Sequence, residues 1–254
     1  MRKQDALRRF ASYELFVFDL DDTLILERDY VRSGFQAVGH HLWRSRGLDG
    51  FAEEAWRLFL MGRRREVFDE VLLSRGIAAD EALIDELVAV YRAHRSQAKL
   101  LPDARELLRF VKHGGQRIAL ISDGAPEGQR SKLKGAGIED CFDSLVLTGE
   151  FGPEFHKSNR AAFEWVQTFL GADPAETVYL ADNPLKDFDA PRELGWGSVR
   201  VRRSAGIYSR IDGPACVPEV KNLFELSAAL RPIGTPAAPA AFPRTRRTEA
   251  TLAH

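Results

Sequence analysis

Cysteine is scarce in this chain, and long apolar runs are absent. Its 254 residues include two cysteines, Cys141 and Cys216, which stand far apart and outside any CxxC spacing. This excludes a disulfide framework and a thiolate zinc site. The longest apolar runs, such as residues 15–18, have the length of a strand and are too short to span a membrane. No apolar stretch of signal-peptide length follows the basic start, so we expect a cytoplasmic protein with no membrane partner.

An excess of one charge is absent as well. The chain has 36 Lys and Arg residues against 37 Asp and Glu residues, which leaves a net charge of −1. A balanced surface exerts no general attraction on polyanions, so we expect no nucleic-acid partner. Apolar residues make up 44% and charged residues 29% of the chain, which are ordinary values for a globular protein. The composition therefore excludes a disordered chain.

Short apolar runs alternate with helical patterns over most of the sequence. The runs have the length of strands and are continuous in character, as expected for strands that are covered on both faces; they lie at residues 14–18, 117–121, 144–147, 178–180 and 198–201. Apolar residues at helical spacing follow in between, at residues 104–111, 163–170 and 223–230. This alternation predicts an α/β fold with a Rossmann-like parallel sheet core flanked by helices.

One long stretch has helical patterns only. Residues 26–98 contain no convincing strand, and apolar stripes recur at helical spacing in residues 31–42 and 83–90. A simple crossover unit needs about 30 residues, so this stretch is too long to be one. We therefore predict an inserted helical cap at 26–98, and a core formed by 1–25 and 99–232. The Pro- and Ala-rich residues 233–254 predict a disordered tail.

Carboxylates gather where the first predicted strand ends. The segment 16–24 reads Phe-Val-Phe-Asp-Leu-Asp-Asp-Thr-Leu. Sites form at the carboxyl ends of parallel strands, and carboxylates close together there repel one another and raise each other's pKa. A divalent cation would remove that cost. A helix cap or turn explains Asp22 and Thr23, but it gives no reason for both Asp19 and Asp21.

Three further motifs follow in a fixed order. A serine ends the second strand (Ser122), a lysine precedes a helix (Lys157), and an acidic pair follows a later strand (Asp182 and Asp187). Together with Asp19-x-Asp21-x-Thr23, and over residues 13–203, this order resembles the haloacid dehalogenase-like hydrolases, in the phosphatase branch with a helical cap between the first and second motifs. The chain departs from the family pattern at Ala181, where glycine is usual, and at Ser158, where proline is usual. Neither change removes a functional group.

The resemblance implies a Mg²⁺-dependent phosphatase that hydrolyses a small-molecule phosphate ester through an aspartyl-phosphate. Asp19 would be the nucleophile, and Asp21 would protonate the leaving alcohol and later deprotonate water. Asp19, Asp182 and the main-chain carbonyl of Asp21 would bind Mg²⁺. The implied phosphate-binding residues are Ser122, Asp123, Gly124 and Lys157. Asp187 is left with two roles, as a further metal ligand or as a partner that orients Lys157.

Other functions of the same fold stay open at this point. A phosphomutase would share all the motifs, a hydrolytic dehalogenase would share the nucleophile, and a non-catalytic binding module would share the fold. A dehalogenase typically lacks the second aspartate and the acidic metal site, so Asp21 and Asp182 argue against it. The sequence does not identify the substrate, and it leaves a monomer and a homodimer equally open.

Cationic and aromatic residues of the predicted cap allow two interpretations. Arg28 and the run Arg63, Arg64 and Arg65 form either a solvated face or a site for a second anionic group of the substrate. Trp43 and Trp56 occupy apolar faces of helical patterns, which predicts that they belong to the core.

Overall fold

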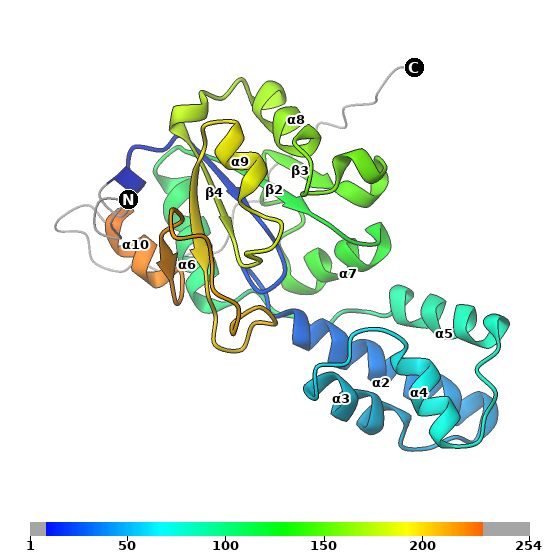
Figure 1. Ribbon diagram of the computed structural model, residues 1–254. Coiled ribbons are helices and arrows are strands. Elements are labelled where there is room, and N and C mark those ends of the chain that lie inside the picture. The colour runs from blue at the N-terminus through cyan, green and yellow to red at the C-terminus, as the bar shows by residue number, and fades with distance from the viewer. Residues whose placement is uncertain (1–8, 231–254) are drawn as a thin grey trace. The chain divides into compact units, whose positions relative to one another are not determined.

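The computed structural model describes residues 9–230, and Figure 1 labels its helices and strands. In this part of the chain one parallel sheet has the strand order β3-β2-β1-β4-β5-β6. Its strands are β1 (Leu15–Phe18), β2 (Arg117–Ser122), β3 (Ser144–Leu147), β4 (Thr177–Ala181), β5 (Gly197–Val201) and β6 (Glu219–Val220). The predicted Rossmann-like α/β fold is confirmed. The two-residue β6 is too short to give a pattern in the sequence, and the predicted tail, 233–254, lies outside the described residues.

Helices connect and cover these strands. The α-helices are α2 (Glu27–Arg46), α3 (Phe51–Leu60), α4 (Val67–Ser74), α5 (Glu81–Ala93), α6 (Pro102–His113), α7 (Pro126–Ala136), α8 (Ala161–Leu170), α9 (Asp189–Glu193) and α10 (Phe224–Leu230). Single 3₁₀ turns are η1 (Thr148–Glu150), η2 (Pro153–Phe155) and η3 (Pro174–Glu176). The helices predicted after Pro102, near Phe163 and after Leu223 are all present. None of the described helices is both long and apolar enough to cross a membrane.

The order of the strands reverses at β1, the strand that ends at Asp19. Strand β1 pairs with β2 on one side and with β4 on the other. Strands β2 and β3 therefore lie on one side of β1, and the strands from β4 onward lie on its other side. Ligand sites of open parallel sheets lie at such a switch point, outside the carboxyl ends of the strands. The carboxyl ends of β1, β2 and β4 therefore meet at one edge of the sheet.

Both faces of the sheet are buried. On one face, alternate strand residues such as Val17, Ile121 and Ala181 pack with Phe163 of α8 and Trp196 in a single apolar cluster. The intervening residues, Phe16 and Phe18 among them, are fully buried as well, and α6 packs against β2 and α10. Burial on both faces explains why the strand sequences are continuous apolar runs.

The chain forms two compact units. Of the described residues, one unit contains 9–26, Leu100–Gly124 and 137–230, and with them the whole sheet. The other consists of Glu27–Lys99 together with Ala125–Ala136, so that α7 belongs with α2, α3, α4 and α5. Helix α7 begins 27 residues after Lys99 in the sequence, which explains why a division by sequence pattern does not assign it to the helical unit.

The helical unit buries the residues of its amphipathic stripes. Val31, Phe35, Val38 and Leu42 of α2 are all buried, as their spacing predicts. The prediction for Trp43 is wrong, because this side chain is 57% exposed. It follows Leu42 directly and is therefore turned about 100° around the helix from the buried stripe.

Two arginines of this unit lie over the ring of the other tryptophan, Trp56. The Trp56 ring is half-buried and stacks on Phe59, with ring centres 5.2 Å apart. Arg28 and Arg32 lie over the Trp56 ring, at 5.5 and 5.6 Å from its centre. Within the described residues neither guanidinium has a carboxylate partner.

Two of the three arginines at residues 63–65 make contacts inside the same unit. Arg63 forms an ion pair with Glu70, and Arg64 lies 3.9 Å from the centre of the Phe59 ring. Arg65 is exposed.

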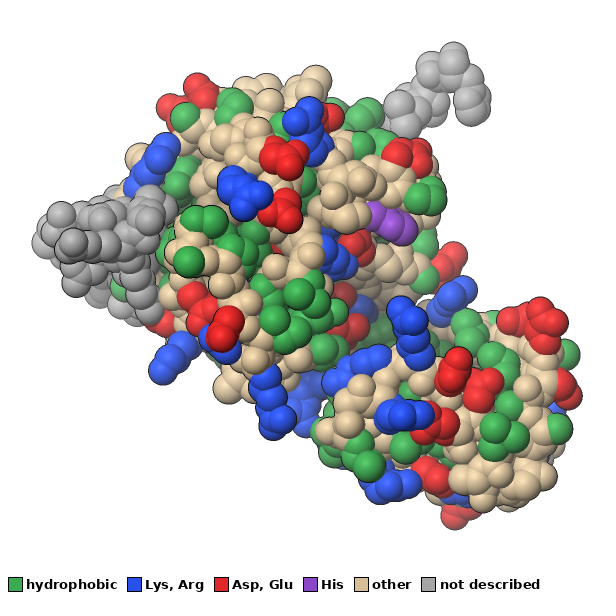
Figure 2. All heavy atoms as spheres, viewed as in Figure 1, with side chains coloured by type: hydrophobic (Ala, Val, Ile, Leu, Met, Phe, Trp, Pro, Cys, Tyr) green, Lys and Arg blue, Asp and Glu red, His purple; other side chains and the backbone are tan. Residues whose placement is uncertain are grey.

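On the face drawn in Figure 2, basic and acidic side chains are interspersed, in agreement with the balanced composition.

Candidate active site

The first motif is held at the end of β1 by the neighbouring strand. The N–H of Asp19 donates to the carbonyl of Leu180 at 2.9 Å, so the ladder between β1 and β4 continues one residue past the end of β1. The chain then turns, with the N–H of Leu24 donating to the carbonyl of Leu20 and a bridge between Asp21 and Ile25. The hydrogen bond to Leu180 sets Asp19 beside the end of β4, which Asp182 follows directly.

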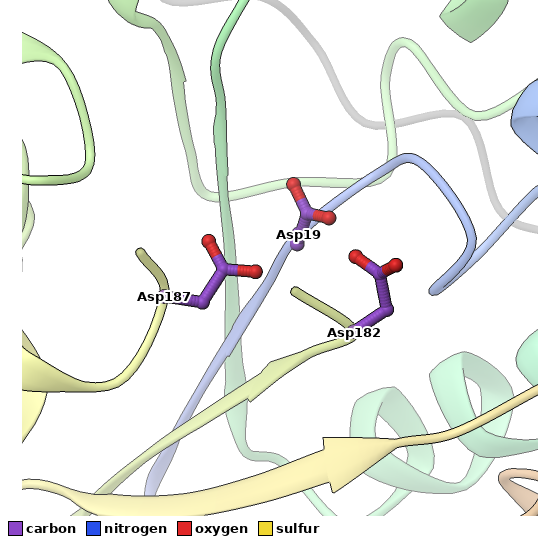
Figure 3. A group of neighbouring side chains, drawn as sticks. All are labelled: Asp19, Asp182 and Asp187. Carbon is purple, nitrogen blue, oxygen red and sulfur yellow. The ribbon is translucent and has the colours of Figure 1, made fainter. Parts of the chain in front are cut away.

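Three aspartates converge at this edge of the sheet (Figure 3). Asp19, Asp182 and Asp187 each offer a carboxylate oxygen, and the three oxygens lie within 4.8 Å of one another. Their exposed fractions are 4%, 7% and 0%. The Oδ2 atom of Asp187 accepts the N–H of Asn183 at 3.0 Å, which fixes this carboxylate in the turn after β4. We call these three residues the carboxylate cluster.

One buried lysine contacts the cluster. The Nζ atom of Lys157 lies 2.6 Å from Oδ1 of Asp19 and 2.9 Å from Oδ1 of Asp187. The first contact is a charged hydrogen bond; the second is a close ion pair without hydrogen-bond geometry. Lys157 is 2% exposed and follows η2, which brings it to the sheet edge from a segment far from β1 in the sequence.

The cluster carries more negative charge than Lys157 balances. Burial is the largest cause that raises the pKa of Asp19, to about 7; Lys157 opposes the rise, and Asp187 and Asp21 add to it. Burial, followed by the charges of Asp19 and Asp187, raises the pKa of Asp182 well above its usual range. Burial alone would lower the pKa of Lys157, but Asp187 and Asp19 outweigh burial and raise it. The site therefore favours additional positive charge.

The second motif is at the end of β2. Ser122 is fully buried at the last position of the strand, and Gly124 adopts a positive φ of 130° that favours glycine. The carboxylate of Asp123 points to protein groups: its Oδ1 accepts the hydroxyl of Thr148 at 2.9 Å and the main-chain N–H of Lys157 at 3.1 Å. Its Oδ2 lies 2.6 Å from Nζ of Lys186. Asp123 thus links the second motif to the segment that carries Lys157.

Four of the sequence-predicted site residues lie together. They are Asp19, Asp182, Asp187 and Lys157. The Asp21 carboxylate is not part of the three-oxygen cluster, although its charge acts on Asp19.

Sequence reasoning did not identify Thr148 and Lys186, which contact Asp123, or Arg200, whose Nε donates to the main-chain carbonyl of Asp182 at 3.0 Å. Lys186 stands between the two aspartates of the fourth motif, which is the one sequence signal that could have drawn attention to it.

The donors of the cluster suit a hard divalent cation. Carboxylate and main-chain carbonyl oxygens are the ligands that Mg²⁺ prefers in proteins. Burial first, and then the neighbouring carboxylates, raise the pKa of Asp19 and of Asp182, and the positive charge of a divalent cation would offset both effects. The residues present therefore fit Mg²⁺.

Comparison with known proteins assigns the chain to a protein family. The family model of the haloacid dehalogenase-like hydrolases matches residues 13–195. Phosphoserine phosphatase of Thermus thermophilus is 30% identical over 190 residues, which cover 73% of this chain and 72% of that protein. (S)-2-haloacid dehalogenase of Xanthobacter autotrophicus is 25% identical over 169 residues, which cover 64% of this chain and 62% of that protein.

Solved structures share the fold. The crystal structure of CbbY from Rhodobacter sphaeroides in complex with phosphate aligns with a TM-score of 0.60 and 19% identity, over 86% of this chain and 99% of that one. At that identity the likeness concerns the fold alone. The family model, by contrast, extends from β1 into the segment after α9 and includes all four motifs. The chain therefore belongs to the haloacid dehalogenase-like hydrolases.

Proposed function

We propose that this hydrolase is a Mg²⁺-dependent phosphatase that cleaves a small-molecule phosphate monoester through an aspartyl-phosphate on Asp19. One observation carries the proposal. Asp19, a member of the buried carboxylate cluster, accepts a hydrogen bond from the buried Lys157 at 2.6 Å, and burial together with the neighbouring carboxylates raises the pKa of both Asp19 and Asp182. Phosphoryl transfer requires a positioned nucleophile and neutralisation of negative charge.

The two carboxylates of the first motif have different roles in the proposed reaction. A carboxylate oxygen of Asp19 attacks phosphorus, a bond to the ester oxygen breaks, and Asp21 gives its proton to the leaving alkoxide. Asp21 then takes a proton from water, which attacks phosphorus and releases phosphate and the free Asp19 carboxylate. Asp19, Asp182 and the main-chain carbonyl of Asp21 would hold Mg²⁺, which when bound supplies positive charge to the phosphoryl oxygens.

Charge counting explains why a lysine accompanies the metal. A phosphate dianion together with Asp19 and Asp182 brings about four negative charges into one small site, and Mg²⁺ with Lys157 returns three positive charges. We propose that Ser122, Lys157 and the main-chain N–H groups of Asp123 and Gly124 bind the phosphate oxygens.

For Asp187 the contacts favour the lysine-orienting role. One of its oxygens lies 2.9 Å from Nζ of Lys157, and the other accepts the N–H of Asn183. Both oxygens are therefore already engaged by groups of the chain. We propose that Asp187 acts chiefly by holding Lys157 in place beside Asp19.

A dehalogenase is the other function that a relative supports, through the likeness to (S)-2-haloacid dehalogenase. A halide leaves without a proton, so a dehalogenase would have no use for Asp21 as an acid. The negative charge of Asp182 beside the nucleophile would also hinder the approach of a carboxylate substrate. The carboxylate cluster thus favours the phosphatase.

We further propose that the helical unit carries the residues that distinguish one phosphate ester from another, because the sheet edge supplies groups for the phosphate alone. Of the arginines considered in the sequence, Arg63 pairs with Glu70, and Arg64 lies against Phe59. Arg28, together with Arg32, is better suited to an anionic group of a substrate, because neither has a carboxylate partner within the described residues.

The test is a screen of the purified protein with Mg²⁺ against a panel of phosphate monoesters, scored by phosphate release. We expect release from at least one ester, and none from Asp19→Asn. The same preparation is tested with 2-chloro acids, scored by chloride release. Chloride release without phosphate release would replace the proposal by dehalogenation, and release of neither would favour a binding module.

A further inference from the structure

An arginine after β5 holds the turn of the first motif. The guanidinium of Arg203 donates to the main-chain carbonyl of Thr23 through Nη2 at 2.7 Å and through Nε at 3.2 Å. Its Nη1 lies 2.8 Å from Oδ2 of Asp103, at the start of α6. The side chains of both members of this ion pair are less than 10% exposed, at 9% and 5%. One buried guanidinium thus connects the turn after Asp21 to the first turn of α6.

The residue beside that turn is fixed from the same segment. Asp22 is buried and adopts a φ of +51°, an uncommon conformation for a residue other than glycine. Its Oδ2 accepts the N–H of Ile207 at 2.7 Å. At Gly206 a Cβ atom would lie 3.4 Å from the Asp22 side chain and 3.2 Å from the carbonyl of Arg203, so the two backbones approach closely here. This contact supports the strained turn between Asp21 and Thr23.

A second arginine holds the fourth motif. Arg200 of β5 is 1% exposed, and its Nε donates to the main-chain carbonyl of Asp182 at 3.0 Å. Its remaining contacts are the carbonyl of Tyr208 at 2.9 Å and Oε2 of Glu219 at 3.0 Å. The segment 200–208 therefore contacts the main chain at both places that supply the proposed metal ligands.

We propose that Arg200 and Arg203 are positioning residues, which set the first-motif turn and Asp182 at the separation that the metal site requires. This inference rests on the proposed function. Asp21 lies beyond the end of β1 and Asp182 beyond the end of β4, and both follow the last ladder hydrogen bond between these strands, which Asp19 donates to Leu180. Ligands that are held by hydrogen bonds from a supporting layer bind metal more tightly, and loss of such support typically costs about 10- to 100-fold in affinity or activity.

The same segment offers a matched control. Arg202 lies between the two arginines, but its guanidinium contacts the carbonyl of Ser209, Asp212 and Glu219, and no group of either motif. Its side chain is 28% exposed. Arg202→Gln therefore removes the same charge from the same segment while leaving the contacts to Thr23 and Asp182 intact.

The experiment compares wild type, Arg203→Gln and Arg202→Gln. Mg²⁺ affinity is measured by calorimetric titration of the metal-free proteins, and amide hydrogen exchange is followed in the peptide that spans residues 19–26. For Arg203→Gln we expect about tenfold weaker Mg²⁺ binding and at least tenfold faster exchange in that peptide. With an aryl phosphate at saturating Mg²⁺, KM should change less than twofold. Arg202→Gln should match wild type in all three measurements.

A purely structural role predicts a different pattern. It would lower the Tm of Arg203→Gln and of Arg202→Gln without a selective effect on Mg²⁺ affinity, and that result would overturn the inference. If Arg203→Gln does not fold, Asp103→Asn takes its place, because it removes the negative charge of the ion pair while the amide oxygen can still accept the N–H of Leu223. Arg203→Lys, which keeps the charge, should recover part of the affinity.

Failure of the proposed function gives a distinct result. A wild type that binds no Mg²⁺ and releases no phosphate contradicts the phosphatase, whatever the variants do. The exchange measurement needs neither metal nor substrate, so equal exchange of residues 19–26 in wild type and Arg203→Gln contradicts the positioning role by itself.

Discussion

Replacing Asp19 by Asn removes one of three buried carboxylates, and we expect it to stabilise the metal-free protein while it abolishes turnover. The pKa of about 7 for Asp19 already includes the attraction of Lys157, so the rise above the ordinary value reflects the net cost of ionising this group in the folded state. Asn has nearly the shape of the protonated acid, and its side-chain oxygen can still accept a hydrogen bond from Lys157.

The size of the effect follows from that pKa. An aspartate in the unfolded chain titrates near pH 3.9, so the rise is about three pKa units, or about 4 kcal/mol at pH 8 at 1.36 kcal/mol per unit. Asn does not reproduce every contact of the protonated acid, so we expect a gain of about 2–4 kcal/mol. At about 2–4 °C per kcal/mol for a protein of this size, Tm should rise by at least about 4 °C.

The difference in stability between Asp19→Asn and wild type should depend on pH. Between about pH 4 and pH 7 the folded state holds a proton on Asp19 that the unfolded state has lost, so the wild type loses stability as pH rises through this range. Asp19→Asn lacks this loss. Its advantage should therefore be largest at pH 8 and fall below about 2 kcal/mol at pH 5. Added Mg²⁺ should raise the Tm of the wild type more than that of the variant.

Thermal unfolding in excess chelator at pH 5 and pH 8 provides the measurement. Asp212→Asn is a suitable control, because the Asp212 side chain is 93% exposed and its replacement should change stability by no more than about 0.5 kcal/mol. A lower Tm for Asp19→Asn than for wild type at pH 8 would refute the reasoning, since the pair with Lys157 would then outweigh the repulsion within the cluster.

Three further outcomes are expected. Excess chelator should abolish phosphate release by the wild type and Mg²⁺ should restore it, whereas Asp182→Ala should stay inactive at every Mg²⁺ concentration assayed. Asp21→Asn should slow hydrolysis of alkyl phosphates by at least about a hundredfold and that of aryl phosphates much less, because aryl oxide leaves without a proton; equal kcat losses on both would assign Asp21 another role. Arg28→Ala should raise KM for the physiological ester about ten- to a hundredfold, as for loss of a charged hydrogen bond, while KM for an aryl phosphate should stay the same.

The sequence predicts most of the fold because its elements are locally encoded. Strands covered on both faces need continuous apolar runs, and β1 to β4 show them. Strand β5 has two apolar residues besides glycine, Val199 and Val201, with Arg200 between them. Two features escaped this reasoning for physical reasons. Strand β6 has two residues and cannot show a period, and Trp43 is adjacent to the buried stripe of α2 without being part of it.

The same distinction applies to the candidate site, where the sequence marks some residues and not others. Asp19 could be predicted from the sequence because several carboxylates directly after an apolar strand are themselves a signal. Asp182 and Lys157 could be predicted from the order of the motifs, which resembles the haloacid dehalogenase-like hydrolases. Arg200 and Arg203 could not, because their partners at the site are the main-chain carbonyls of Asp182 and Thr23. A carbonyl is present at every position, so no residue type in the sequence marks it as the partner of an arginine.

The choice of carbonyls as partners has a consequence for the charge of the site. If the Arg200 guanidinium paired with the carboxylate of Asp182, the cluster would carry less net negative charge and would attract a divalent cation more weakly. Instead the guanidinium charge is directed to Glu219 and to carbonyl groups, and that of Arg203 to Asp103. Among the described residues, the ammonium of Lys157 is the cation that contacts the carboxylate cluster. The arginines therefore hold the ligand-bearing turns in place while leaving the negative charge of the carboxylate cluster available to a divalent cation.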